Sequence, residues 1–474
     1  MSRIVGLYDW NIHKLLDKQL SYQVEGVEFI PSYIEGRWDG CIRLFNTRNK
    51  TFSTGLLSKV CDILTQNNIQ YTITDTRIKP ILDQSIPTNT KLRQDQEDVV
   101  KTCMDKARGI CMLPTSYGKS FSQVELVCRL NLPTVIVVHK LDIAEQFKAW
   151  FKERANIDIG YVGNGTINPK HITVCMIQTL VNAFKIKTKE IKSESINMSE
   201  YQKIYNMCAN AQVVITDEMH AMLTGDVWSK IFMKFTNAYF RIGFSATPYK
   251  CFPEQLAAEA IYGPVIAEES YSNCIKKGYI VKPEVIVYNY KQQGLPFGMR
   301  FNAAYKERIV ENEDRNLLIC QIALKYFQAN KKVFIPVTHL NHGKLLKQML
   351  EVVIGKGNVI FLEGCKTVEE RQKGMRDFEN GGKILLGTQI LNEGVNIKSM
   401  DVLINARCSL SKNVFLQTIG RCLRLSPGKI KATIIDIQDK NVKYFAYHGR
   451  ERYQILQECG FDIKEINSIE DIKI

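Results

Sequence analysis

Short apolar segments alternate with amphipathic helical segments over most of the chain. Five apolar segments before residue 250 are strand candidates: 110–113, 134–138, 172–176, 213–216 and 241–244. The pattern restarts after about residue 300 with five more: 333–337, 359–362, 384–386, 402–405 and 433–437. Strands that are apolar on both faces and separated by helices form parallel sheets covered on both sides. The sequence therefore predicts an α/β fold with two doubly wound parallel-sheet domains in tandem.

The N-terminal part of the chain has a different pattern, typical of a small mixed unit. Segment 27–34 alternates as a strand does, segment 41–45 is a short apolar run, and segment 56–66 has helical spacing. The polar stretch 83–90 is typical of a linker. We predict three domains: an N-terminal α+β accessory domain over 1–85, a first α/β domain over 86–280 and a second over 281–474.

The chain is basic, with a formal net charge of +14. A field of this sign attracts phosphate polyanions, although a basic enzyme with no such partner has the same composition. No apolar segment approaches the roughly 20 residues needed to span a bilayer, and the first residues lack the apolar core of a signal peptide. These observations predict a cytoplasmic protein with no membrane partner.

The cysteines and histidines do not form a recognisable metal motif. The 14 cysteines include no C-x-x-C pair, so neither a zinc ribbon nor a redox dithiol is indicated, and buried thiols in a reducing compartment are expected. His339 and His342 form H-x-x-H without a nearby cysteine or acidic residue. We interpret these two histidines as ordinary residues at the start of a helix.

A candidate phosphate-binding loop follows the first apolar strand. It comprises seven residues: Pro114, Thr115, Ser116, Tyr117, Gly118, Lys119 and Ser120. In a strand–loop–helix context, backbone N–H groups face the phosphates, the lysine supplies the countercharge, and the Ser120 hydroxyl is a ligand for Mg²⁺. Leu113 stands where the usual motif has its first glycine, so a chance surface G-K-S is the alternative.

Two acidic residues, Asp217 and Glu218, end the strand candidate 213–216. An aspartate at the tip of such a strand can hold hydrated Mg²⁺, and an adjacent glutamate can orient and deprotonate the attacking water. The pair could instead cap the next helix. Segment 245–248, Ser-Ala-Thr-Pro, follows another strand and is expected at the same sheet edge, where ligands bind in such folds.

Segments 114–120, 217–220 and 245–248 resemble motifs I, II and III of the superfamily 2 helicases of the DExH kind. This resemblance implies two RecA-like domains, ATP with Mg²⁺ as cofactors, and adenine recognition by Arg93 and Gln96. Ser116 and Tyr117 depart from the family, which usually has glycine and a small residue there. The departures put only the backbone contacts of the loop in question.

The second α/β domain contains segments similar to motifs V and VI of the same family. Segment 387–397 resembles motif V and includes Gly394 near the nucleotide, with Asn396 where the family more often has aspartate. Segment 417–424 resembles motif VI, with Gln417, Arg421 and Arg424 in catalytic roles. Arginines one helical turn apart share a face and can reach the γ-phosphate, and pairing with local carboxylates is the alternative.

DNA contacts are expected on loops at the carboxyl ends of the strands. The family resemblance assigns them loosely to five residues: His139, Gln178, Thr179, Thr338 and Thr388. The lysine-rich segment 185–192 is predicted to be a solvated surface loop, with nucleic-acid contact as the alternative.

Segment 32–45 resembles the accessory domain of bacteriophage UvsW-type DNA helicases. Arg37, Trp38 and Arg43 are candidates for phosphate binding and base stacking, although Trp38 could equally be the core of a small domain. The resemblance extends over nearly the whole chain, including segments 314–316 and 436–439.

The UvsW-type resemblance implies an ATP-dependent helicase that remodels branched DNA in phage recombination or replication, in the host cytoplasm. Replication or recombination proteins are possible partners. The alternatives are a duplex-DNA translocase that separates no strands and an RNA helicase. A protein that only binds nucleic acid would need a broken ATP site, whereas Lys119, Asp217, Glu218 and Arg421 are all present.

Overall fold

The computed structural model describes residues 1–24, 26–184, 197–222, 227–249, 251–292, 294, 298–363, 368–381, 383–388, 400–409 and 411–474. These residues form two compact units. The first contains Met1–Leu113 and Gly118–Glu268, and the second contains Pro114–Tyr117 and Glu269–Ile474. The lysine-rich segment 185–192 and most of the motif V segment lie outside the described residues.

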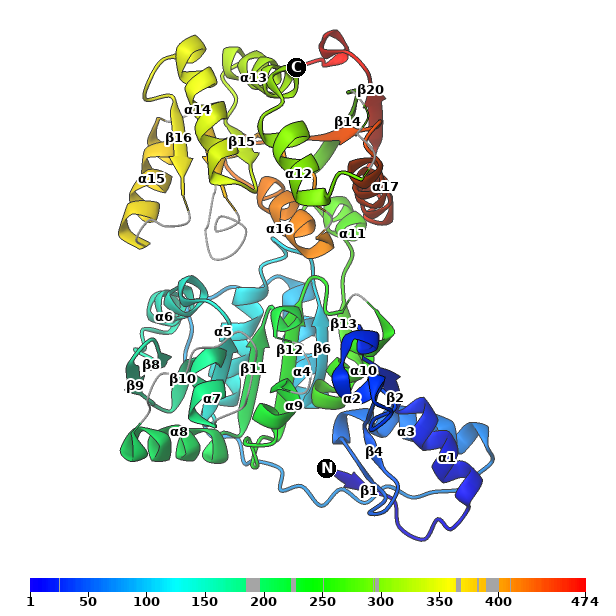
Figure 1. Ribbon diagram of the computed structural model, residues 1–474. Coiled ribbons are helices and arrows are strands. Elements are labelled where there is room, and N and C mark those ends of the chain that lie inside the picture. The colour runs from blue at the N-terminus through cyan, green and yellow to red at the C-terminus, as the bar shows by residue number, and fades with distance from the viewer. Residues whose placement is uncertain are drawn as a thin grey trace. The chain divides into compact units, whose positions relative to one another are not determined.

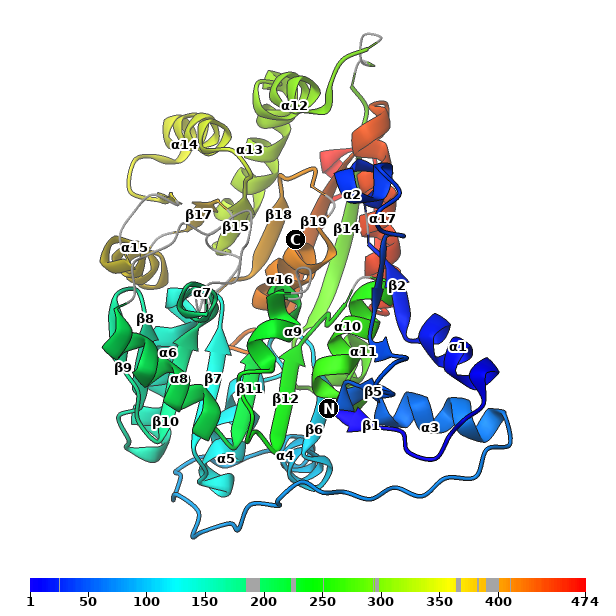
Figure 2. The ribbon, with the colours of Figure 1, turned by 60° about the horizontal axis from the view of Figure 1, so that its bottom comes forward.

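The first unit is built around an eight-stranded sheet of order β13-β6-β12-β11-β7-β10-β8-β9. Its strands are β6 (Arg108–Met112), β7 (Thr134–Val138), β8 (Gly160–Gly163), β9 (Thr166–Asn168), β10 (Ile172–Met176), β11 (Val213–Asp217), β12 (Phe240–Ser245) and β13 (Val265–Glu268). All neighbours pair in parallel except β8 and β9, which form an antiparallel hairpin. The five strands predicted for this part of the chain are confirmed to within one or two residues. Figure 2 shows β11 and β12 side by side.

Helices cover both faces of this sheet (Figure 1). They are α4 (Gln94–Lys106), α5 (Lys119–Leu130), α6 (Leu141–Ala155), α7 (Ile177–Ala183), α8 (Met198–Asn210), α9 (Val227–Phe232) and α10 (Phe252–Tyr262). Every residue of β7 and β11 is buried, as expected for strands that pack against helices on both sides.

The N-terminal segment packs onto α10 of the first unit. Its elements are β1 (Ser2–Arg3), α1 (Trp10–Gln19), β2 (Ser21–Gln23), η1 (Val27–Phe29), α2 (Pro31–Ile34), β3 (Cys41–Arg43), β4 (Phe45–Asn46), β5 (Thr51–Phe52) and α3 (Leu57–Gln66). Leu256 and Ala260 of α10 belong to its core, and Lys59 pairs with Glu259 at 3.1 Å. A Cβ on Gly55 would lie 2.0 Å from the Glu259 carbonyl oxygen, so this close approach requires glycine.

The prediction of a strand over 27–34 was wrong. This segment forms the short helices η1 and α2, separated by Ile30, with Gly26 left-handed at φ 69° before the first and Pro31 starting the second. Proline favours the first position of a helix because its missing N–H needs no partner there. The helix predicted over 56–66 is confirmed as α3.

The second unit contains a seven-stranded, all-parallel sheet of order β16-β17-β15-β18-β19-β14-β20. Its strands are β14 (Lys282–Tyr290), β15 (Val333–Pro336), β16 (Val359–Leu362), β17 (Ile384–Gly387), β18 (Val402–Asn405), β19 (Lys431–Asp439) and β20 (Ile463–Ile466). The five predicted strands are confirmed. β14 and β20 were not predicted, and β14 inserts between β19 and β20.

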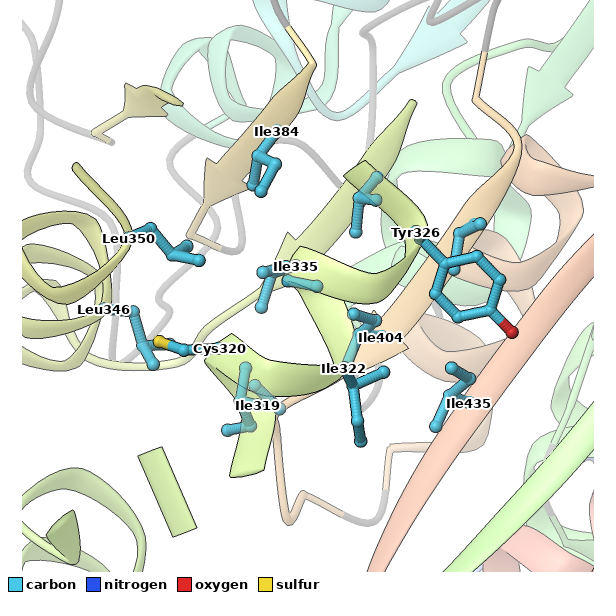
Figure 3. Packing of buried hydrophobic residues seen from close by; sticks show 14 of the residues in the cluster. Ile319, Cys320, Ile322, Tyr326, Ile335, Leu346, Leu350, Ile384, Ile404 and Ile435 are labelled. Atoms are coloured by element: carbon cyan, nitrogen blue, oxygen red, sulfur yellow. The ribbon is translucent and has the colours of Figure 1, made fainter. Parts of the chain in front are cut away.

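Helices α11 to α17 accompany this sheet: α11 (Tyr271–Lys276), α12 (Phe301–Tyr305), α13 (Glu313–Gln328), α14 (Leu340–Ile354), α15 (Val368–Asn380), α16 (Lys412–Cys422) and α17 (Lys443–Glu458). Figure 3 shows Ile319 and Ile322 of α13 and Leu346 of α14 packing with Ile335 and Ile404 of the sheet. The doubly wound architecture predicted for this half is present.

His342 and most of the described cysteines are buried within the fold. His339 precedes α14 and His342 is buried, with its Nε2 2.8 Å from the Asn316 Oδ1. Burial, together with Arg315 and His339, lowers the pKa of His342 to about 3, so this ring is neutral. Most described cysteines are buried free thiols. No helix among the described residues combines the length and apolar character needed to cross a bilayer.

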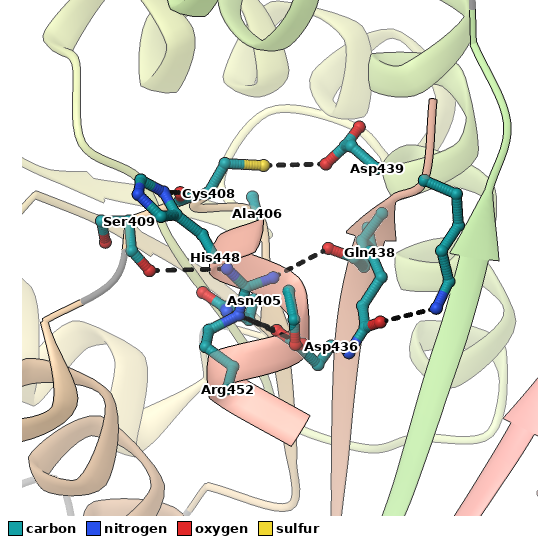
Figure 4. A network of polar contacts seen from close by, with 12 residues as sticks. Asn405, Ala406, Cys408, Ser409, Asp436, Gln438, Asp439, His448 and Arg452 are labelled. Atoms are coloured by element: carbon teal, nitrogen blue, oxygen red, sulfur yellow. Dashed lines mark hydrogen bonds and ion pairs between the residues drawn. The ribbon is translucent and has the colours of Figure 1, made fainter. Parts of the chain in front are cut away.

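A buried charged network holds the loop after β18 (Figure 4). The Arg452 Nε donates to both carboxylate oxygens of Asp436, at 2.9 and 3.1 Å, and its other nitrogens donate to the carbonyls of Ser409 and Ile437. Asn405 donates to the same carboxylate at 2.7 Å. The Arg315 Nε and Nη2 donate to the two carboxylate oxygens of Asp439, at 2.9 and 3.3 Å, and all four charged side chains are almost fully buried.

Replacing Arg452 by methionine is expected to destabilise the protein by about 3–5 kcal/mol, because Asp436 would lose the cation that compensates its buried charge. Urea unfolding measures the effect. The matched control is Lys431→Met on β19, whose exposed pair with Glu284 has side chains 56% and 36% exposed and should contribute under about 1 kcal/mol. Equal losses for both variants would contradict the special role of the buried pair.

Candidate functional site

The predicted phosphate loop lies between β6 and α5. Gly118 precedes α5 with φ 92°, a left-handed conformation that favours glycine, and Lys119 is the first helical residue. Ser120 follows in the first turn. The backbone N–H groups at the start of a helix have no partners within the helix and favour anions. The strand–loop–helix context predicted for segment 114–120 is therefore confirmed.

Gly118 cannot be exchanged for alanine without strain. A Cβ at this position would lie 2.7 Å from the Gln96 Nε2, and the backbone has positive φ. We expect Gly118→Ala to cost on the order of 1–3 kcal/mol in folding and to raise the KM for ATP, because alanine is strained at this positive φ and the Gln96 amide beside the loop must move. Thermal unfolding and ATPase kinetics measure both effects. Gly165→Ala, also at positive φ but with no atom within 4 Å of its Cβ, separates backbone strain from the loss of the ATP site.

Lys119, Asp217 and Glu218 meet at the carboxyl edge of the first sheet. The Lys119 Nζ donates to the Glu218 Oε1 at 3.0 Å, and the two side chains are only 11% and 13% exposed. Glu218 follows β11 in a left-handed conformation, with φ 48°. Asp217 is the last residue of β11 and is buried. Residues almost one hundred positions apart thus form one charged site.

The pKa values of the two carboxyl groups are shifted in opposite directions. Burial and the neighbouring Glu218 charge raise the pKa of Asp217 above its ordinary value. For Glu218, burial alone would raise the pKa, but Lys119 and His220 lower it below its ordinary value. Glu218 is therefore charged at neutral pH, and a neighbouring cation would stabilise the charged form of Asp217.

Gln123 and His220 complete the polar site, and the sequence analysis missed both roles. The Gln123 Nε2 donates to the Asp217 Oδ1 at 2.8 Å, and Gln123 lies one helical turn after Lys119 on α5. The sequence did contain a signal for Gln123, because a residue four positions after Lys119 lies on the same face of a helix. The His220 Nδ1 lies 2.8 Å from the Ser245 Oγ, and the end of β12 lies at the same sheet edge as the acidic pair, as predicted.

Arg93 and Gln96, predicted to recognise adenine, lie at the start of α4. The Gln96 side-chain oxygen accepts from the Arg93 backbone N–H at 3.1 Å, and its Nε2 lies 3.5 Å from the Gly118 carbonyl oxygen. The Arg93 guanidinium donates to Asp95. Gln96 is thus beside the phosphate loop, and adenine contact by these two residues stays a prediction.

In the second unit, Gln417 and Arg421 are buried residues of α16. The expectation that Arg421 and Arg424 lie on one helical face was wrong, because α16 ends at Cys422 and Arg424 lies beyond the Leu423 cap. Of the motif V residues, Thr388 follows β17 and is 8% exposed, whereas Gly394 lies outside the described residues. The catalytic roles of these residues stay predictions.

Two of the predicted DNA-contacting loops meet in the first unit. The Gln178 Nε2 donates to the His139 carbonyl at 3.0 Å, which brings the loop after β7 to the start of α7, and Thr179 is 7% exposed. In the second unit, the Thr338 hydroxyl accepts from Tyr305 at 3.0 Å. DNA contact by any of them stays a prediction.

The N-terminal candidates already have partners within their own domain. Arg37 pairs with Glu35, and the Trp38 indole N–H donates to the Cys41 carbonyl at 3.1 Å. Arg43 pairs with Asp39 and Asp17, and hydrogen bonding to Arg43 lowers the pKa of Asp39 to about 2. Trp38 is half-buried and lies outside the main N-terminal core, so DNA binding by these side chains stays a prediction.

Three family models match consecutive parts of the chain. The model described as "DNA helicase UvsW, N-terminal" matches residues 8–74. The model for the res subunit of type III restriction enzymes matches residues 89–250, and the helicase conserved C-terminal domain matches residues 315–426. The match over residues 89–250 includes Lys119, Asp217 and Glu218, and the match over residues 315–426 includes Gln417 and Arg421.

Relatives cover most of the chain at low identity. The chain is 24% identical to the ATP-dependent DNA helicase uvsW of Enterobacteria phage T4, over 96% of this chain and 95% of that protein. It is 22% identical to the DNA 3'-5' translocase XPB2 of Sulfurisphaera tokodaii, over 77% and 86%. Among solved structures, a fragment of a putative HsdR subunit of a type I restriction enzyme from Vibrio vulnificus superposes with a TM-score of 0.58 at 16% identity, covering 81% of this chain and 70% of that one.

Proposed function

We propose that this chain is a superfamily 2 helicase of the UvsW type that uses ATP hydrolysis to remodel branched DNA such as forks and Holliday junctions. The observation that carries the proposal is the largely buried Lys119–Glu218 pair beside the buried Asp217 at the carboxyl edge of the first sheet. The N-terminal match to the UvsW model supports branched DNA as the substrate. Replication or recombination proteins are the partners expected of such an enzyme.

Mg²⁺ fits the residues of this site. Asp217 is a buried carboxylate whose charge is disfavoured by burial and by Glu218, so a divalent cation there would compensate it. Asp217 and the Ser120 hydroxyl would hold the ion, which would neutralise charge on the phosphates. The Gln123 amide, bonded to one Asp217 oxygen, would orient the carboxylate.

ATP and Glu218 compete for one ammonium group. Lys119 donates to Glu218 at 3.0 Å, whereas in ATP binding the same ammonium would neutralise the β- and γ-phosphates. When Lys119 turns to the phosphates, Glu218 loses the interaction that lowers its pKa. Binding of the nucleotide would therefore make Glu218 a stronger base when a water molecule must be activated.

Glu218 then acts as the general base. Its carboxylate accepts a proton from water, the water oxygen forms a bond to the γ-phosphorus, and the bond from that phosphorus to the bridging oxygen breaks, which releases ADP and phosphate. Charge develops on the γ-phosphoryl oxygens during this step. We assign its stabilisation to Lys119 and to Arg421 of the motif VI segment.

ATPase stimulation by different nucleic acids tests the proposal. Forked DNA, plain duplex, single-stranded DNA and RNA of equal length are compared at physiological salt, which suppresses the nonspecific electrostatic contribution. We expect forked DNA to give the largest stimulation and labelled forks to be unwound. Preferential stimulation by RNA, or no stimulation by any DNA, would overturn the proposal.

A duplex-DNA translocase is the second candidate function. The match of residues 89–250 to the res subunit of type III restriction enzymes favours this alternative. Strand displacement distinguishes the two candidates, because a translocase consumes ATP on duplex DNA but releases no labelled strand from a fork. A helicase of the proposed kind consumes ATP and also releases the labelled strand.

A further inference from the structure

Two exposed aromatic side chains flank the start of α1. Tyr8 is 87% exposed and Trp10 is 58% exposed, although large aromatic residues are highly buried on average. Asp9 lies between them and caps the helix, accepting from the backbone N–H groups of Asn11 at 2.8 Å and Ile12 at 3.4 Å. The cap fixes the backbone here, so both rings extend from a defined turn.

Each of these rings has a lysine close to its face. The Lys14 Nζ lies 5.7 Å from the centre of the Trp10 ring, and the Lys50 Nζ lies 4.8 Å from the centre of the Tyr8 ring. Lys50 also donates to the Leu7 carbonyl at 2.8 Å, which ties the turn between β4 and β5 to the Tyr8 segment. An aromatic ring beside an ammonium group matches a nucleotide, which combines a flat base with an anionic phosphate.

The surroundings of the two rings are positively charged. Trp10, Lys14 and Lys18 lie four residues apart on α1 and therefore share one helical face, on which all three are exposed. Arg48, in the turn before β5, is exposed as well. Asp9 keeps its negative charge while it caps the helix, but the four basic side chains of Lys14, Lys18, Arg48 and Lys50 outnumber it.

We propose that Tyr8 and Trp10, with Lys14, Lys18 and Lys50, form a stacking site for unpaired nucleotides of single-stranded DNA. This site differs from the one predicted around Trp38, whose indole N–H and neighbouring Arg43 already have partners. The inference rests on the proposed helicase function and deepens it, because it names the unpaired arm of a branched substrate as the ligand of the N-terminal domain.

Equilibrium binding of labelled DNA to the full chain tests the site. Fluorescence anisotropy without nucleotide compares an oligothymidine strand, a fork with single-stranded arms and a blunt duplex. Trp10→Ala and Tyr8→Ala should each raise the Kd for the oligothymidine and the fork about 5- to 100-fold, because base–aromatic stacking is lost. The blunt duplex should bind as before. Lys14→Gln should make DNA binding less sensitive to salt: the slope of log K against log salt concentration should fall by about the contribution of one phosphate contact.

Phe29→Ala is the matched control, since Phe29 is 79% exposed in the same domain but lies on η1. It should bind every DNA as the wild type does, and ATP hydrolysis without DNA should be unchanged in all variants. Wild-type affinity of Tyr8→Ala and Trp10→Ala for the oligothymidine would overturn the inference and leave a protein-docking face as the interpretation. Equal weakening for duplex would also overturn it.

Failure of this inference and failure of the proposed function give different results. If the wild type shows no DNA-stimulated ATPase, the helicase proposal itself fails. If the wild type is stimulated and only the variants lack an effect, the stacking site alone is wrong. Tyr8→Ala keeps the test valid should Trp10→Ala prove unstable, because the 87% exposed Tyr8 side chain supports little packing.

Discussion

Replacing Glu218 by glutamine is expected to lower the kcat for ATP hydrolysis by a factor on the order of 10²–10⁴, the usual contribution of a general base. The amide keeps the size of the side chain but cannot accept the proton of the attacking water. Because glutamine also lacks the charge that holds Lys119 at 3.0 Å, the ammonium is available to the phosphates and ATP binding should persist or improve. Steady-state kinetics and nucleotide titration measure the two effects separately.

Glu153→Gln is the control for this change, since Glu153 is an exposed residue near the end of α6. It should leave kcat unchanged. If Glu218→Gln hydrolysed ATP at the wild-type rate while folded, Glu218 would not be the base. A large rise in KM with normal kcat would instead identify Glu218 as a binding residue only.

Replacing Arg421 by alanine should lower kcat by about 10³-fold or more, with little change in the KM for ATP. An arginine that contacts the γ-phosphoryl group stabilises charge that develops mainly in the transition state. Arg421→Lys should recover only part of the rate, because the ammonium lacks the planar, two-pronged donor geometry of a guanidinium. ATPase kinetics at saturating DNA measure these effects.

Arg421 is only 6% exposed, so folding must be checked by thermal unfolding of each variant. The exposed Arg450 on α17 supplies the control, and Arg450→Ala should hydrolyse ATP normally. A folded Arg421→Ala variant with wild-type kcat would show that Arg421 has only a local structural role. The same experiment on Arg424, which lies beyond the end of α16, tests whether both arginines act.

The strands were predictable where burial leaves a simple pattern. β7 and β11 are buried at every position, and such continuous apolar runs are recognisable without knowledge of their neighbours. The pattern of segment 27–34 led to a wrong prediction, because its apolar residues alternate as in a strand although the segment belongs to no sheet. Phe29 and Ile34 are instead exposed on short helices that Gly26 and Pro31 delimit.

Local patterns also located the candidate site but not its internal bonds. The glycine and lysine at the start of α5 and the acidic pair at the end of β11 belong to short motifs, so both positions were predictable. The Lys119–Glu218 pair and the Gln123–Asp217 bond depend on the strand order β6-β12-β11, which segments far apart in the chain determine. Sequence spacing contains no information on that order.

β14 was missed for a related reason, and its place in the sheet affects how the protein is made. This strand is the first of the second sheet to leave the ribosome, yet its neighbours β19 and β20 are the last. All nine of its residues pair with β19. The backbone N–H and C=O groups of β14 therefore have no partner in this strand until some 140 further residues have been translated. The first sheet has the same feature, because its first strand, β6, pairs with β12 and β13, the last two strands of that sheet, but the whole sheet is complete at Glu268. Synthesis from the N-terminus therefore favours a folded first unit before the second can close.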